Sequence, residues 1–216
     1  MDDFAEILET ARLRVSRRAL EAGYEASGGY LGRRWRDHRD VPVQSHVSAI
    51  LAGADPDLPR RIGPGVMAEL VEAYARPALL VPPAVDPGAR AALEALAARG
   101  YAMVLVSNTM RTPGVVLRTL LQRYGLLEFF AHTTFSDEVG VRKPAPEIFA
   151  LSLRAVGGDA ATAVHVGDDA VLDVEGARAA GMRAIHLQAA PGPSAADAVI
   201  ATLKELPAAV AGLDVD

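Results

Sequence analysis

The sequence predicts an α/β fold in which a Rossmann-like parallel sheet is joined to a helical lobe at its N-terminal side. From residue 88 onward, short apolar segments alternate with segments of helical spacing, each about 10 to 15 residues long. Strands and helices in this alternation form parallel sheets that helices cover on both faces. Residues 1–80 show helical spacing interrupted by a polar and irregular tract, and the composition changes at the proline-rich stretch 76–88. We therefore expect two domains, a helical one at 1–80 and an α/β core at 81–216.

The individual elements follow from the spacing of apolar residues. In the first domain this spacing predicts one amphipathic helix over 2–26, a polar and irregular tract over 27–40, and short helices at 47–51 and 66–74. In the second domain, helices are expected at 88–99, 112–124, 146–156 and 170–180. Strands are expected at 101–106, 132–135, 163–166 and 183–187.

The composition excludes several classes of protein. With 22 basic and 27 acidic residues the net charge is −5, which argues against a nucleic-acid-binding surface driven by overall charge. The absence of cysteine excludes disulfides, thiolate metal sites and cysteine nucleophiles, and is compatible with a reducing compartment. The charged first 26 residues resemble neither a signal peptide nor a membrane span. We expect a cytoplasmic protein with no nucleic-acid or membrane partner. Whether it forms a homo-oligomer stays open, because alanine-rich helix faces suit packing within a chain as well as between chains.

The stretch MVLVSNT (103–109) places polar side chains at the end of an apolar strand. Ser107, Asn108 and Thr109 would lie at the carboxyl edge of the sheet, where open α/β folds bind ligands. A structural interpretation is equally good, in which Ser107 or Thr109 caps the next helix. The strand end by itself leaves the two interpretations open.

Lys143 lies in the stretch GVRKPAPEIF (140–149), directly before two closely spaced prolines. Pro146 suits the first turn of a helix, so Lys143 would be fixed just before that helix. From there it could extend over the sheet edge as a point charge for an anion. A solvated surface lysine is the plainer interpretation.

Three carboxylates follow the expected strand 163–166 in the stretch GDDAVLD. Asp168, Asp169 and Asp173 could satisfy free amides at a helix start, where the helix dipole favours negative charge. They could instead bind a hard cation such as Mg²⁺ through oxygen. Taken alone, the triplet fits both interpretations.

The order of these three stretches along the chain resembles motifs two, three and four of the haloacid dehalogenase superfamily. The resemblance covers about residues 80–190. It implies a Rossmann-like core and a helical cap that closes over the site and selects the substrate. It also implies Mg²⁺-dependent hydrolysis of phosphate esters through an aspartyl intermediate. Residues 1–80 would be the cap, and the substrate would be a small phosphorylated metabolite.

The resemblance further implies a role for each matching residue. Ser107 and the adjacent Asn108 amide would bind the transferring phosphoryl group, and Lys143 would neutralise its charge. Asp168 would bind Mg²⁺, while the two further aspartates would assist the metal or orient the lysine. The expected site comprises phosphate-binding Ser107, Asn108 and Lys143, metal-binding Asp168 and Asp169, and catalytic Lys143 and Asp173.

One motif of the family is missing from this sequence. Family members open with a strand ending in Asp-x-Asp, whose first aspartate attacks phosphorus and whose second is the general acid and base. Asp2 and Asp3 follow no apolar strand, so we interpret them as first-turn partners of a helix dipole. Asp214 and Asp216 end an apolar run, which we interpret as a frayed tail rather than a permuted first strand. The first core strand and its nucleophile are therefore expected to be absent.

Two functions stay open. In the first, the chain is a Mg²⁺-dependent phosphatase whose given start omits the first strand, so that as written it is inactive or impaired. In the second, it is a non-catalytic relative that binds a phosphorylated ligand or a protein partner through Ser107 and Lys143. An in-frame apolar run ending in Asp-x-Asp upstream of Met1 would favour the first function, and a stop codon there the second. A receiver domain is excluded, because receivers place the acidic pair first and the lysine last.

Two further features carry weaker hypotheses. Arg33, Trp35 and Arg36 form a basic cluster with an aromatic residue, which could line a cap pocket for anionic substrates or touch nucleic acid. A solvated cap loop is favoured, because nearby aspartates dilute the charge. His165, inside an expected strand, is interpreted as a core or supporting residue rather than a catalyst.

Overall fold

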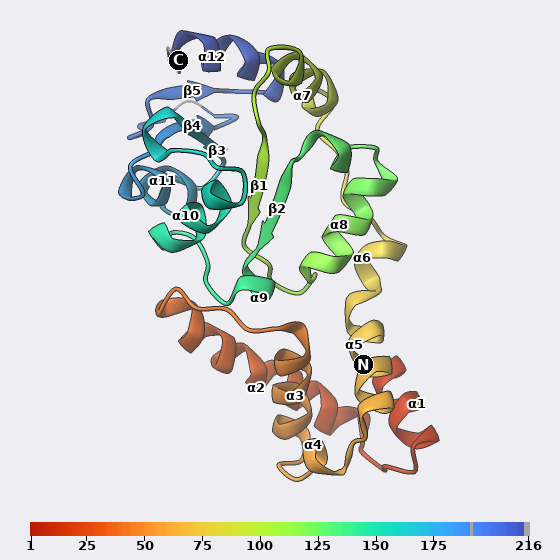
Figure 1. The fold of residues 1–216 in the computed structure, drawn as a ribbon. Helices are drawn as coiled ribbons and strands as arrows, with labels where there is room; N and C mark the ends of the chain where they lie inside the picture. The colour runs from red at the N-terminus through yellow and green to blue at the C-terminus, as the bar shows by residue number, and fades with distance from the viewer. Residues whose placement is uncertain (191, 214–216) are drawn as a thin grey trace.

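A computed structural model describes residues 1–190 and 192–213 and shows two lobes (Figure 1). The helical lobe, residues 1–80, lies at the bottom of the view, and the α/β lobe, residues 81–213, lies above it. The helical lobe contains α1 (Asp2–Thr10), α2 (Arg17–Arg36), α3 (Val43–Ala54), α4 (Leu58–Arg61), α5 (Pro64–Ala75) and α6 (Pro77–Leu80). None of the helices in the described ranges is both long and apolar enough to cross a membrane.

The helical lobe has an apolar core of its own, which is made of side chains from α1, α2, α3 and α5. The prediction that Asp2 and Asp3 lie in the first turn of a helix is confirmed. The prediction of one helix over 2–26 is wrong, because α1 ends before Arg12, whose φ is 58°, and α2 begins afresh. Ser16 caps the new helix by accepting a hydrogen bond from the main-chain nitrogen of Ala19 at 3.2 Å.

The tract 27–40, expected to be irregular, is helical as far as Arg36. Its polar composition does not prevent this, because α2 packs along α3 and most of the polar residues face solvent. The two helices come closest at Gly23 and Gly53. A Cβ atom on Gly23 would lie 2.2 Å from the carbonyl oxygen of Ile50, so glycine is needed there for this packing.

Gly23→Ala is therefore expected to destabilise the protein by about 3 kcal/mol, because the new methyl group must push two helix backbones apart. Gly28→Ala is the matched control, since it lies in the same helix with no atom near its Cβ position. The control should stabilise the protein by about 0.5–1 kcal/mol through helix propensity. Chemical denaturation of both variants measures the difference, and equal stabilities would contradict the close packing of α2 on α3.

The α/β lobe alternates strands and helices as predicted. Its strands are β1 (Val104–Ser107), β2 (His132–Phe135), β3 (Val164–Gly167), β4 (Arg183–Leu187) and β5 (Ala198–Ile200). Its helices are α7 (Ala89–Ala98), α8 (Gly114–Arg123), α9 (Ser136–Val139), α10 (Pro146–Ala155), α11 (Gly176–Ala179) and α12 (Leu206–Gly212), with a π-helix at Ala170–Glu175. The expected helix 170–180 is thus a π-helix followed by α11, and β5 was not expected.

The strands form two parallel sheets rather than the single sheet that the alternation predicts. One sheet pairs β1 with β2, and the other has the order β3-β4-β5. Within the described residues β1 and β3 are not paired with each other, and each keeps one edge free. A cavity of about 560 Å³ lies along both strands, and its lining is largely apolar. We call this cavity the slot between β1 and β3.

Candidate active site

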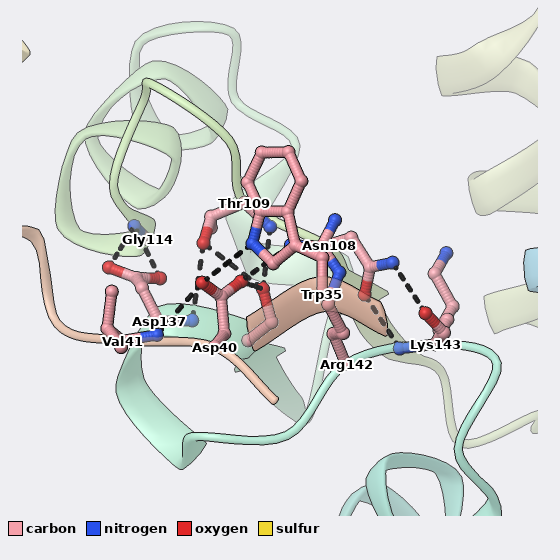
Figure 2. A network of polar contacts seen from close by, with 10 residues as sticks. Trp35, Asp40, Val41, Asn108, Thr109, Gly114, Asp137, Arg142 and Lys143 are labelled. Atoms are coloured by element: carbon pink, nitrogen blue, oxygen red, sulfur yellow. Dashed lines mark hydrogen bonds and ion pairs between the residues drawn. The ribbon is translucent and has the colours of Figure 1, made fainter. Parts of the chain in front are cut away.

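The carboxyl ends of β1 and β3 are joined through Lys143, which lies just before α10. The side chain of Asn108, which directly follows β1, binds the main chain of Lys143 twice (Figure 2). The Lys143 nitrogen donates to Asn108 Oδ1 at 2.8 Å, and Asn108 Nδ2 donates to the Lys143 carbonyl at 3.0 Å. The structure therefore brings Asn108 and Lys143 together, with half-buried Ser107 beside them at the end of β1.

The other end of Lys143 is fixed by Asp173. Lys143 Nζ lies 2.5 Å from Asp173 Oδ1, which also accepts a hydrogen bond from His165 Nε2 at 2.8 Å. The main-chain nitrogen of Asp169 donates to Asp173 Oδ2 at 3.1 Å. Gly167 makes room for this carboxylate, because a Cβ atom there would overlap the Asp173 side chain. Asp173 is thus a buried anchor that holds Lys143 at the edge of the slot.

The electrostatics of this group keep Asp173 ionised. Burial by itself would raise the pKa of Asp173, but the hydrogen bond from His165 and the charge of Lys143 outweigh it and hold the pKa well below its usual range. Burial lowers the pKa of His165, so its ring is neutral and its Nε2–H donates to the carboxylate. The interpretation of His165 as a supporting residue is compatible with this contact, and its position in a strand just before Gly-Asp was the available signal.

The other two acidic residues serve different purposes. Asp169 caps the π-helix, since its Oδ1 accepts from the main-chain nitrogens of Val171 and Leu172 at 2.9 and 2.7 Å. This is the helix-start role that the sequence left open. Asp168 is exposed, and its carbonyl oxygen accepts a hydrogen bond from His186 Nε2 at 3.2 Å.

The residues present do not complete a magnesium site. Across the described ranges, no three His, Cys, Asp or Glu side chains are grouped so that they could hold a metal ion. Asp173 is engaged by three protein donors and Asp169 by its helix, which leaves Asp168 as the freest of the three carboxylates. Binding of Mg²⁺ by Asp168 and Asp169 stays a prediction.

Two other sequence interpretations are corrected by the structure. Thr109 does not cap α8, whose N-cap is Pro113; instead its hydroxyl group contacts Ser136 Oγ at 3.1 Å. The basic cluster at 33–36 is the last turn of α2 rather than a loop. Its Trp35 ring lies against the guanidinium group of Arg142, 4.1 Å from the ring centroid, and so packs on the α/β lobe.

A family model described as haloacid dehalogenase-like hydrolase matches residues 6–181. The chain belongs to this family. The predicted recognition and α/β fold are thereby confirmed. Glyceraldehyde 3-phosphate phosphatase of Methanopyrus kandleri is 30% identical to this hydrolase-family chain over 194 residues, which are 85% of the chain and 78% of the relative. Phosphoserine phosphatase of Thermus thermophilus is 38% identical over 117 residues, or 54% of the chain and 45% of the relative.

Solved structures agree with this membership. The 2-haloacid dehalogenase from Pseudomonas syringae pv. Tomato DC3000 superposes with a TM-score of 0.68 over 98% of this chain and 89% of that one, at 23% identity, and shows the shared fold. The HAD phosphatase from Thermococcus onnurineus has a TM-score of 0.53 at 33% identity and covers 64% of this chain and 61% of that one. The family member described here spans about half the length of the Thermus phosphatase, so its own activity is a matter for proposal.

Proposed function

We propose that this chain carries most of the active site of a phosphate-ester hydrolase for small phosphorylated metabolites. The observation that carries the proposal is the fixed position of Lys143, which Asn108 holds by its main chain and Asp173 by its ammonium group. A cation held in this way at a strand edge suits the charge of a phosphoryl group. Two curated relatives are named as phosphatases of such metabolites, phosphoserine and glyceraldehyde 3-phosphate.

Each group then has a defined task. The hydroxyl of Ser107 and the main-chain amide of Asn108 bind phosphoryl oxygens, while Lys143 neutralises their charge. Asp173 and His165 orient the lysine and keep it from turning away into solvent. The helical lobe is the cap that selects the substrate. We also propose that the protein acts in the cytoplasm and has no nucleic-acid or membrane partner.

The nucleophile is the part that these residues do not supply. We place it on an additional strand in the slot between β1 and β3, whose two free edges and apolar lining suit a parallel strand. A parallel strand there ends at the edge that faces the helical lobe, and this lobe contains Met1 (Figure 1). An Asp-x-Asp at that strand end would lie beside Lys143 and Asp168. It would also add the carboxylates that a Mg²⁺ site still needs.

A second function, binding of a phosphorylated ligand without turnover, is favoured by one observation. Asn108 and Asp173 hold Lys143 in a fixed position in the described chain, and a cation held in this way suits a bound phosphate whether or not a nucleophile lies beside it. Both functions require that the chain binds phosphate, so this step is tested first.

Titration of the chain with inorganic phosphate, followed by ³¹P NMR, is expected to show saturable binding. Lys143→Met should weaken that binding by about 10- to 100-fold, because a hydrogen bond to a charged group contributes roughly 1.5–3 kcal/mol. The chain has two lysines, so Lys204→Met provides a control that should bind like the parent. Lys204 follows β5 and lies against Gly88, at the start of α7. Equal affinities for the two variants would contradict the assignment of Lys143.

A further inference from the structure

Asp40, a residue of the helical lobe, reaches into the α/β lobe with a buried carboxylate. Its side chain is only 4% exposed. It accepts four hydrogen bonds, from Trp35 Nε1 at 3.3 Å, Val41 N at 2.9 Å, Ser136 Oγ at 2.6 Å and Arg142 Nη1 at 3.1 Å (Figure 2). Two of these donors belong to the segment around Asp40 and two to the α/β lobe. All four neighbours donate, so an ionised carboxylate is the one group that satisfies them all.

The first connection from Asp40 runs through Ser136 to the end of β1. The hydroxyl proton of Ser136 is given to Asp40, so Ser136 Oγ acts as the acceptor towards Thr109. It accepts from the Thr109 main-chain nitrogen at 2.8 Å and from the Thr109 hydroxyl at 3.1 Å. Thr109 directly follows Asn108, and its position therefore depends on Asp40.

The second connection runs through Arg142 to the lysine loop. Arg142 forms an ion pair with Asp40 at 3.1 Å, and its guanidinium group lies over the Trp35 ring. The next residue is Lys143, whose main chain is bound to Asn108 by the two hydrogen bonds described above. The two connections thus start at the Asp40 carboxylate and end at Asn108 and Lys143, which are hydrogen-bonded to each other.

We propose that Asp40 is a positioning residue, which fixes the Asn108–Thr109 loop and the Lys143 loop relative to each other and links both to the helical lobe by hydrogen bonds. The carboxylate acts through hydrogen bonds to the loops and does not touch the substrate. The helical lobe and the phosphate-binding groups then move as a coupled unit, and loosening one loosens the other. The part of this inference that concerns affinity rests on the proposed phosphate binding.

Asp40→Asn is the test, because asparagine keeps the shape but turns an NH₂ group towards two neighbours that are themselves donors. Hydrogen exchange at the Thr109 and Lys143 amides is the first measurement, since neither amide touches Asp40. Both amides are expected to exchange about tenfold faster or more. Phosphate affinity should fall by about 2- to 30-fold at a temperature where the variant is folded.

The matched control is Ser27→Ala. Ser27 is buried in the helical lobe, and the hydrogen bonds that its hydroxyl makes, to the Tyr24 carbonyl at 2.6 Å and with His46 at 3.1 Å, stay within that lobe. The control should lower the melting temperature without changing exchange at Thr109 and Lys143. If Asp40→Asn fails to fold, Ser136→Ala serves in its place, because it cuts only the first connection and should speed exchange at Lys143 as well.

Trp35 provides a second measurement, because it is the one tryptophan of the chain and donates to Asp40. Phosphate should alter its fluorescence in the parent and not in Asp40→Asn, since coupling between two sites is reciprocal. Unchanged exchange at both amides in Asp40→Asn would overturn the proposal. If the parent chain binds no phosphate, the proposed function fails, and the exchange experiment still decides the role of Asp40.

Discussion

An extension of about 20 residues upstream of Met1, made of a strand that ends in Asp-x-Asp and a loop that leads to Met1, is expected to raise the melting temperature by about 10 °C or more. The free edges of β1 and β3 leave main-chain donors and acceptors along an apolar cavity of about 560 Å³. An unpaired buried polar group costs roughly 1–3 kcal/mol, so several of them consume much of the 5–15 kcal/mol or so that stabilises an ordinary domain. A strand that pairs with both edges recovers part of that loss.

The same extension is expected to bring Mg²⁺-dependent phosphatase activity. The strand end would place a nucleophile beside Lys143, which Asp173 already holds in position. Thermal melting and phosphate release from a generic phosphate ester measure the two effects separately.

Two matched extensions separate stability from chemistry. An extension ending in Asn-x-Asn should give the same rise in melting temperature and no activity, because it fills the slot without a nucleophile. An extension with prolines inside the strand should give neither effect, because proline removes ladder hydrogen bonds. If the Asp-x-Asp extension changes neither stability nor activity, the short chain functions as it is and binds rather than hydrolyses.

The sequence predicted local elements well where their pattern was self-contained. The strands 132–135 and 183–187 match β2 and β4 residue for residue, because short runs that contain β-branched, aromatic or apolar residues lie there between helical segments. The tract 27–40 was misjudged because its helix, α2, is stabilised by packing on α3, where buried Ser27 contacts His46, and not by its own composition. The spacing of apolar residues also does not show which strands pair with each other. The strands form two sheets where the sequence predicted one.

The residues of the candidate site were likewise predictable only where a local sequence pattern marked them. The order of Ser107, Lys143 and Asp173 along the chain carried the family resemblance, which left Asp173 either to assist the metal or to orient Lys143. In the structure Asp173 is bound to Lys143. Asp40 had no such signal, since its partner Ser136 is 96 residues away and only the folded chain brings them together. Groups that position a site from another lobe are therefore found from structure rather than from sequence.

The chain as written is expected to be nearly inactive as a phosphatase. Removing a covalent nucleophile leaves only binding and electrostatic contributions, so turnover should fall by several orders of magnitude relative to a complete enzyme. In the proposed site Lys143 and Ser107 would still attract a phosphate ester, but the Asp173 carboxylate is engaged by Lys143 and His165 and is not free to attack it. Phosphate release from a generic ester in the presence of Mg²⁺ is the measurement.

The double variant Asp214→Asn, Asp216→Asn completes this experiment. These residues lie outside the described part of the chain, and they form an Asp-x-Asp that ends an apolar run. The other such pair, Asp55 and Asp57, follows helix α3 of the helical lobe rather than a strand. Activity that disappears in the double variant would identify the C-terminal segment as the source of the nucleophile. Turnover on the order of 1 per second or faster that survives both substitutions would show that the reaction needs no aspartate of this kind, and the proposed mechanism would be wrong.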